Sequence, residues 1–176
     1  MKIGIDFGGV CSSKADDYEN DNKVVINKDG IRSISMPGCL EALTELSKVH
    51  ELYLISFCGA KRAKETGQYL QRVYPDLFKE LYFVKKRTFK NGVCKYLGID
   101  VMIDDRLDVL ETITDAYCIH FKGDPLYIAD HVNDNSHYNG LSANNWQETV
   151  EMIAKLESRD NVPDNNALKI IKIYPY

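Results

Sequence analysis

The chain has 176 residues, which is long enough for one domain with a sizeable core. Its apolar fraction of 44% and its charged fraction of 27% are ordinary for a globular protein. A formal net charge of −4 argues against nucleic-acid binding, and no apolar run reaches the roughly 18 residues of a membrane span. The N-terminus leads straight into a strand without a signal peptide, and the five cysteines include no C-x-x-C motif, so we expect a cytoplasmic protein.

Short apolar runs alternate with helical patterns along the chain. Strands are expected at 2–6, 51–56, 81–84, 99–103 and 116–120. Helices are expected from Pro37-Gly38 onward and at 60–73, 89–97, 107–114 and 143–157. This alternation implies a parallel sheet with helices on both faces, in which ligands bind at the carboxyl ends of the strands. We therefore predict an α/β fold of the Rossmann-like type.

One domain is expected to span residues 1–157. Within it, residues 11–34 are predicted to form a small β-hairpin flap with Asp29-Gly30 as its turn, and no segment is large enough to form a cap. The polar segment 122–142 follows a strand, so we place it at the same edge of the sheet as the ligand. Residues 158–176 read as a linker followed by an edge strand or a tail.

Polar side chains stand where three of the expected strands end. Asp6 follows the first strand, Ser56 closes the second, and Asp104-Asp105 follow the fourth. Two carboxylates at adjacent strand tips repel each other unless a cation lies between them, and hard oxygen ligands with positions open to water and phosphate suit Mg²⁺. A serine can hydrogen-bond a phosphate oxygen, and a carboxylate can attack phosphorus to form an aspartyl-phosphate.

The order and spacing of these motifs resemble the haloacid dehalogenase (HAD) superfamily, which consists mostly of Mg²⁺-dependent phosphatases, and within it the small 5′(3′)-deoxyribonucleotidase-like group. The family's first motif, a strand followed by D-x-D, is matched in part by Ile5-Asp6-Phe7-Gly8, and its second by Leu54-Ile55-Ser56. Its third motif is a lysine ahead of the fourth strand. Its fourth, a run into paired acids, is matched by Val101-Met102-Ile103-Asp104-Asp105-Arg106. The similarity covers about residues 1–157.

The resemblance implies a role for each matched residue. Asp6 would be the nucleophile and a metal ligand, and Ser56 would hold the transferring phosphoryl group. The backbone carbonyl of Gly8 and the carboxylate of Asp105 would complete the Mg²⁺ site, with Asp104 as a second or water-mediated ligand.

The third-motif lysine and the remaining contacts follow from the same resemblance. We assign the lysine to Lys90, which begins the helix leading to the fourth strand, and Lys86 is its rival. Phe57 and Gly9 are expected to contact the substrate together with Ser56 and Lys90. Asp108 either supports the waters of the metal or is an exposed helix position.

The chain departs from the family's first motif at Gly8. The second Asp of that motif is the family's general acid and base, and general acid–base help is typically worth about 10²–10⁴ in rate. The enzyme would therefore act slowly, act on good leaving groups such as acyl or aryl phosphates, or bind a phosphorylated ligand without turnover. Asp16, Asp17 or Glu19 of the flap could supply a replacement acid.

Two functions follow from these observations. The first is a Mg²⁺-dependent phosphohydrolase that acts through Asp6 on a phosphate monoester, either a small molecule or a larger phosphorylated substrate. The second is a catalytically silent domain that binds a ligand or a protein partner. The resemblance also associates a missing cap with larger substrates or with a cap lent by a second copy of the chain, so a homo-oligomer is one alternative.

Overall fold

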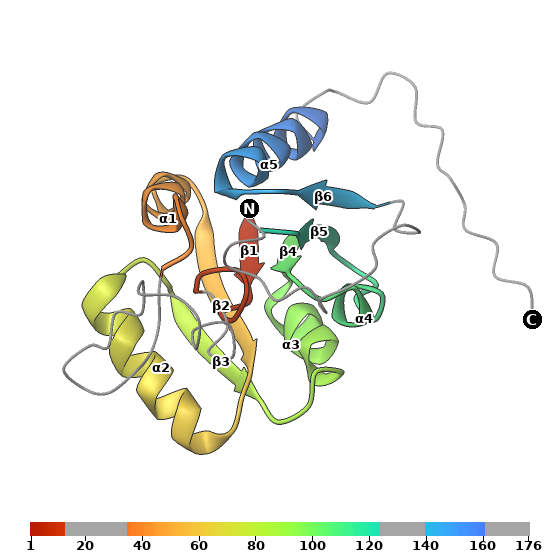
Figure 1. Ribbon diagram of the computed structural model, residues 1–176. Helices are drawn as coiled ribbons and strands as arrows, with labels where there is room; N and C mark the ends of the chain where they lie inside the picture. The colour runs from red at the N-terminus through yellow and green to blue at the C-terminus, as the bar shows by residue number, and fades with distance from the viewer. Residues whose placement is uncertain (13–34, 124–139, 161–176) are drawn as a thin grey trace, which may run out of the picture.

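A parallel sheet lies at the centre of the protein, as the computed structural model shows for residues 1–12, 35–123 and 140–160 (Figure 1). Within these residues the sheet has six strands in the order β3-β2-β1-β4-β5-β6, and every neighbouring pair is parallel. The strands are β1 Lys2–Ile5, β2 Glu51–Phe57, β3 Glu80–Val84, β4 Val101–Asp104, β5 Tyr117–Phe121 and β6 Leu141–Ala143. The predicted α/β architecture is confirmed.

Helices cover both faces of the sheet. They are α1 Cys39–Ser47, α2 Ala60–Val73, α3 Phe89–Leu97, α4 Leu107–Leu110 and α5 Trp146–Asp160. Successive strand side chains point to opposite faces, so Leu52 and Leu54 of β2 join one core with α1, α2 and α5, whereas Tyr53 and Ile55 join the other with α3 and α4. Among the described helices, none is both long and apolar enough to cross a membrane.

A glycine in β1 allows the central strands to pack closely. A Cβ atom at Gly4 would lie 2.9 Å from Sδ of Met102 and 3.0 Å from Cδ1 of Ile55. Real Cβ atoms essentially never approach other atoms to less than 3.0 Å, so a larger residue at this position would force the side chains of Met102 and Ile55 to shift. Gly4 thus allows these side chains to pack closely against the strand whose end carries Asp6.

The structure differs from the sequence prediction at the ends of several elements. Residues 141–143 form β6, although we expected a loop through 142 and a helix from 143. With a single large apolar residue, Leu141, this short strand carries no periodic signal and depends on its pairing with β5. The helix expected at 107–114 ends at Leu110, because the following Thr112-Ile113-Thr114 is β-branched and disfavours helix.

The predicted flap and tail lie largely outside the described residues. Ser12 and Ser35, which flank the segment 13–34, form an isolated antiparallel bridge, so the chain leaves and returns at one place. Helix α5 continues to Asp160, so the first three residues of the expected linker 158–176 are helical.

Candidate active site

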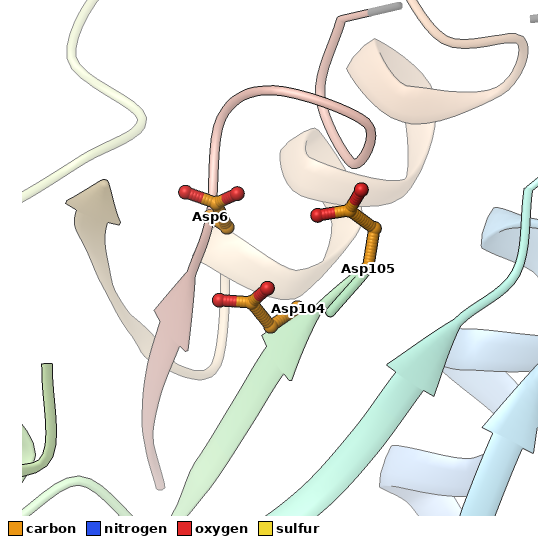
Figure 2. A group of neighbouring side chains, drawn as sticks. All are labelled: Asp6, Asp104 and Asp105. Carbon is orange, nitrogen blue, oxygen red and sulfur yellow. The ribbon is translucent and has the colours of Figure 1, made fainter. Parts of the chain in front are cut away.

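Three carboxylates meet where β1 and β4 end (Figure 2). Asp6 follows β1 directly, Asp104 is the last residue of β4, and Asp105 comes next. The two strands are held in register, since Ile5 pairs with Ile103 and the Asp6 N–H donates to the Ile103 carbonyl at 3.0 Å. One carboxylate oxygen of each residue lies within 4.8 Å of the others, and all three residues are buried. The structure therefore brings these predicted metal ligands together.

Lys90 is the buried cation of this cluster. Its Nζ lies 2.9 Å from Oδ1 of Asp6 and 2.6 Å from Oδ2 of Asp104, and its side chain is 2% exposed. Burial opposes the charged form, but the carboxylates of Asp6 and Asp104 outweigh it and raise the pKa of Lys90. The rival Lys86 is exposed and places its Nζ 5.9 Å from the ring centre of Phe89. The geometry therefore favours Lys90.

The cluster holds more negative than positive charge. Burial and the neighbouring carboxylates of Asp6 and Asp105 raise the pKa of Asp104 to about 8, against the opposing effect of Lys90. A divalent cation would offset this excess, and carboxylate oxygens are the ligands that Mg²⁺ prefers. Both oxygens of Asp104 already accept hydrogen bonds, one from Lys90 and one from the Arg106 N–H at 3.0 Å. The donor set fits Mg²⁺, with Asp104 also holding Lys90.

The loop after β1 depends on Gly9 and leaves room at Gly8. Gly9 has a φ of 85°, and a Cβ atom there would lie 2.5 Å from Oδ2 of Asp105. The carboxylate of Asp105 thus packs against the Gly9 backbone. Around Gly8, by contrast, no atom of the described residues lies within 4 Å of an added Cβ, and its backbone is not left-handed. The position where the D-x-D motif has its second Asp is open to a side chain.

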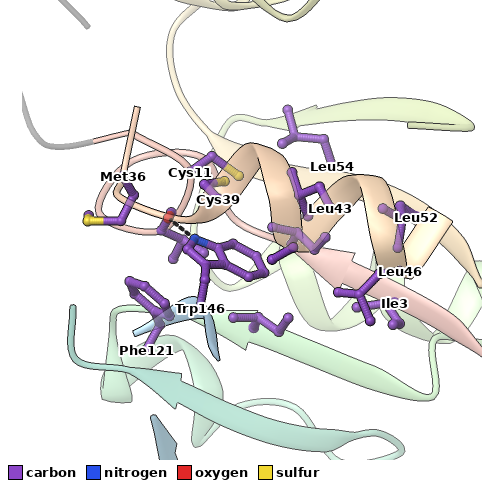
Figure 3. Close-up of a cluster of buried hydrophobic side chains, with 14 of the residues drawn as sticks. Ile3, Cys11, Met36, Cys39, Leu43, Leu46, Leu52, Leu54, Phe121 and Trp146 are labelled. Atoms are coloured by element: carbon purple, nitrogen blue, oxygen red, sulfur yellow. Dashed lines mark hydrogen bonds between the residues drawn. The ribbon is translucent and has the colours of Figure 1, made fainter. Parts of the chain in front are cut away.

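Side chains and backbone from distant parts of the chain hold this loop in place. The indole Nε1 of Trp146, at the start of α5, donates to the Val10 carbonyl at 3.0 Å (Figure 3). The Met36 N–H donates to the Cys11 carbonyl at 2.8 Å, and the Cys11 thiol donates to the Asp6 carbonyl at 3.3 Å. These contacts were not predicted from the sequence. The one tryptophan of the chain, at the start of an expected helix, was the signal that could have pointed to them.

His120 supports the cluster from β5. It pairs in register with Asp104, and its Nε2 lies 3.1 Å from the Asp105 carbonyl oxygen. Burial lowers the pKa of His120, so we assign the neutral tautomer in which Nε2–H donates this bond. Sequence reasoning missed this role because His120 reads only as one residue of an apolar strand.

The end of β2 supplies the next predicted groups. Ser56 is 6% exposed and lies two residues beyond Leu54, which pairs with Ile5 of β1. Phe57 follows it at the edge of the sheet with 39% exposure, and the Arg87 guanidinium lies 4.6 Å from the centre of its ring. Ser56 and Phe57 therefore lie at the same edge as Asp6, on the adjacent strand.

The remaining candidates are not part of the carboxylate cluster. Asp108 accepts two hydrogen bonds of 2.8 Å from Arg106, and its side chain is 55% exposed. The proposed replacement acids Asp16, Asp17 and Glu19 lie outside the described residues.

Comparison of the fold with solved structures identifies HAD-superfamily hydrolases as neighbours. A HAD-like family hydrolase from Xanthomonas campestris superposes with a TM-score of 0.60 at 13% identity, over 90% of this chain and 96% of that one. A HAD-superfamily hydrolase of subfamily IA from Geobacter sulfurreducens PCA gives 0.55 at 13% identity, over 86% and 98%. YfnB from Bacillus subtilis, assigned as a HAD hydrolase and bound to magnesium, gives 0.51 at 13% identity, over 71% and 57%.

No protein-family model matches the sequence, and neither does any curated protein sequence. At these low identities the neighbours establish the fold. The chain therefore has the Rossmann-like fold of HAD-superfamily hydrolases.

Proposed function

We propose that this chain is a Mg²⁺-dependent phosphohydrolase that acts through Asp6 on a phosphate monoester. The observation that carries the proposal is the buried cluster in which Lys90 contacts both Asp6 and Asp104 beside Asp105. The fold supports it, since the neighbours are HAD hydrolases, and so does the magnesium bound to YfnB.

In the proposed reaction, an oxygen of the Asp6 carboxylate attacks phosphorus, and the bond between phosphorus and the ester oxygen breaks. The departing alcohol takes a proton from solvent, because Gly8 has none to give. Water then attacks the phosphorus of the aspartyl-phosphate, and the bond between phosphorus and the Asp6 oxygen breaks. One proton of this water stays on the inorganic phosphate and the other is released to solvent. Asp6 regains its carboxylate, so the cycle balances.

Other residues of the chain would position and neutralise the reacting groups. Lys90 lies 2.9 Å from Asp6 and offsets charge on the phosphoryl oxygens, while the Ser56 hydroxyl donates a hydrogen bond to one of them. We assign the Phe57 backbone to the same phosphoryl group, whereas the Gly9 N–H already donates to the Ser12 carbonyl at 2.6 Å. Mg²⁺ held by Asp6, Asp105 and the Gly8 carbonyl, with Asp104 behind them, would supply electrostatic stabilisation of the phosphoryl charge.

Gly8 sets the expected substrate range. Without a positioned acid, the leaving oxygen must depart as an anion or take its proton from solvent. Protonation by a positioned general acid is typically worth about 10²–10⁴ in rate. Acyl and aryl phosphates need little protonation, whereas alkyl phosphates need much. We therefore expect a slow enzyme, or one restricted to good leaving groups.

A second candidate function is binding without turnover, and Gly8 is the observation that favours it. The same site would then hold a phosphorylated ligand or a protein partner in a catalytically silent domain.

A panel of acetyl phosphate, aryl phosphates and alkyl phosphates, each with Mg²⁺ or a chelator, separates the two functions. We expect the parent chain to hydrolyse the acyl and aryl esters only with Mg²⁺, and Asp6→Asn to lose at least about 10³ of that rate, because the nucleophile is gone. Activity that appears only in Gly8→Asp would instead favour the silent domain.

Gly8→Asp and Gly8→Asn form a matched pair for the missing acid. Both side chains fit the open space at Gly8, but only the carboxyl group can donate a proton. Gly8→Asp should raise alkyl phosphate hydrolysis by about 10²–10⁴ over Gly8→Asn, with little gain on acetyl phosphate. Equal rates in the two variants would contradict the role assigned to this position.

A further inference from the structure

An exposed basic rim borders the site on the side of β2 and β3. It consists of six cationic residues from two short segments: Lys61, Arg62 and Lys64 in the first turns of α2, and Lys85, Lys86 and Arg87 between β3 and α3. All six are exposed, and no acidic residue occurs within 58–64 or 85–99. The charge is therefore local, in a chain whose net charge is −4.

Three exposed lysines elsewhere in the described residues have acidic partners. Lys48 pairs with Glu45, Lys79 with Glu51, and Lys95 with Asp115. None of the six rim cations forms an ion pair with a described acidic side chain. The hydrogen bonds from Arg106 lower the pKa of Asp108, and the charge of Arg87 also lowers it, so Arg87 has an acidic neighbour outside ion-pair distance. The like charges of the rim still repel one another, and an anion that binds there would relieve this repulsion.

One ring contact and one electrostatic relation tie the basic rim to the active site. Phe57 directly follows Ser56, and its ring lies 4.6 Å from the Arg87 guanidinium, which it helps to hold at the sheet edge. Cys58, the next residue, lies within electrostatic reach of both Asp6 and Arg62. Burial raises its pKa, Arg62 lowers it and Asp6 raises it. The two arginines thus stand beside the place where the ester would bind.

We propose that Arg62 and Arg87 of the basic rim bind a second anionic group, a phosphate or a carboxylate, carried by the alcohol part of a small phosphate ester. The proposal rests on the proposed function, because the reacting phosphoryl group must lie beside Asp6. The planar guanidinium offers paired donors that match a carboxylate or a phosphate, and the exposed rim leaves them accessible. The substrate is then a small polyanion rather than a simple monoester.

Binding of non-hydrolysable phosphonates tests the proposal without relying on turnover. We compare ω-carboxyalkylphosphonates of two to four methylenes with alkylphosphonates of the same length, by calorimetry in excess Mg²⁺. At least one carboxylated compound should bind about tenfold more tightly than its alkyl match. Arg62→Gln and Arg87→Gln should each remove about threefold of that preference, and high salt should reduce it, because exposed charges are screened.

Lys155→Gln is the matched control for loss of one exposed charge. Lys155 lies in α5, two residues before Glu157. The Glu157 carboxylate is 3.5 Å from Nε2 of His50, which directly precedes β2, so this part of α5 lies near the end of the sheet opposite the active site. The substitution should leave the preference unchanged, and a similar loss in this variant would overturn the proposal. Equal binding of carboxylated and alkyl compounds, still dependent on Mg²⁺, would overturn the rim proposal and leave the proposed function standing. No phosphonate binding by the parent chain would overturn both.

Discussion

The carboxyl edge of the sheet has two halves, one with buried and mutually paired charges and one with exposed charges. Where β1 and β4 end, the carboxylates and Lys90 are buried and lie within contact distance of one another. Where β2 and β3 end, the basic rim is exposed, and its described cations form no ion pairs with described acids. The first half is suited to chemistry, since buried charges are held in fixed positions. The second is suited to recognition, since exposed charges remain available to a ligand.

The difference has an energetic consequence. Removal of one partner of a buried ion pair typically costs about 3–5 kcal/mol, because the other charge is left in a poorly solvated place. Exposed pairs are worth about 0–1 kcal/mol. Substitutions in the two halves should therefore separate cleanly, with stability affected in the buried half and ligand preference in the exposed half.

Lys90→Met should show the largest effect. The substitution leaves the carboxylates of Asp6 and Asp104 buried without their cation, so we expect the free energy of unfolding in chelator to fall by about 3–5 kcal/mol. Urea unfolding followed by circular dichroism measures the change. Mg²⁺ should restore part of the loss by taking over the positive charge.

Lys86→Met is the control for that substitution. It removes the same charge from an exposed position four residues earlier, and its free energy of unfolding should stay within about 0.5 kcal/mol of the parent. Equal losses of unfolding free energy in the two lysine variants would contradict the claim that charges in the buried half contribute more to stability than charges in the exposed half.

Gly9→Ala should come next, with Gly8→Ala as its neighbour in the same loop. At Gly9 the left-handed backbone disfavours a side chain by about 1–2 kcal/mol, and the added Cβ would displace the Asp105 carboxylate. We expect lower stability and weaker Mg²⁺ binding, measured by denaturation and by calorimetry. Gly8→Ala meets no atom of the described residues within 4 Å and should change neither quantity appreciably. Mg²⁺ binding that is the same in both variants would contradict the position assigned to Asp105.

A dependence of stability on pH is a further expected effect in the buried half. The pKa of Asp104 is about 8 in the folded chain, above its ordinary value of 3.8, so the folded state binds the proton more tightly than the unfolded state does. In chelator, the stabilisation is complete below pH 4 and is lost as the pH rises toward 8. Asp104→Asn should flatten this slope in a series of unfolding curves. A parent chain whose stability rises over that range would rule out an excess of carboxylate charge.

The sequence was sufficient for most of the fold and for the carboxylates at the carboxyl edge of the sheet. Helix α2 begins and ends where its pattern predicts, at Ala60 and Val73, because apolar periodicity and the following Tyr74-Pro75 are local signals. The cluster of Asp6, Asp104 and Asp105 was also predictable, since carboxyl ends of neighbouring parallel strands must meet at one edge.

The supports of the site could not be predicted in the same way. The hydrogen bond from Trp146 to Val10 joins residues 136 positions apart, and no local pattern encodes it. The contact of His120 with the Asp105 carbonyl depends on the register of β4 and β5. Strand β6 is short, so its pairing partner rather than its sequence defines it. These features arise from packing, which a single sequence read along its length does not reveal.

A crystal structure with Mg²⁺ and BeF₃⁻ tests the central claim most directly. Our account predicts beryllium bonded to a carboxylate oxygen of Asp6, with Mg²⁺ contacting Asp6 and Asp105 and with Ser56 and Lys90 facing the fluorines. Asp6 still bound only to Lys90, with BeF₃⁻ absent or elsewhere, would contradict it.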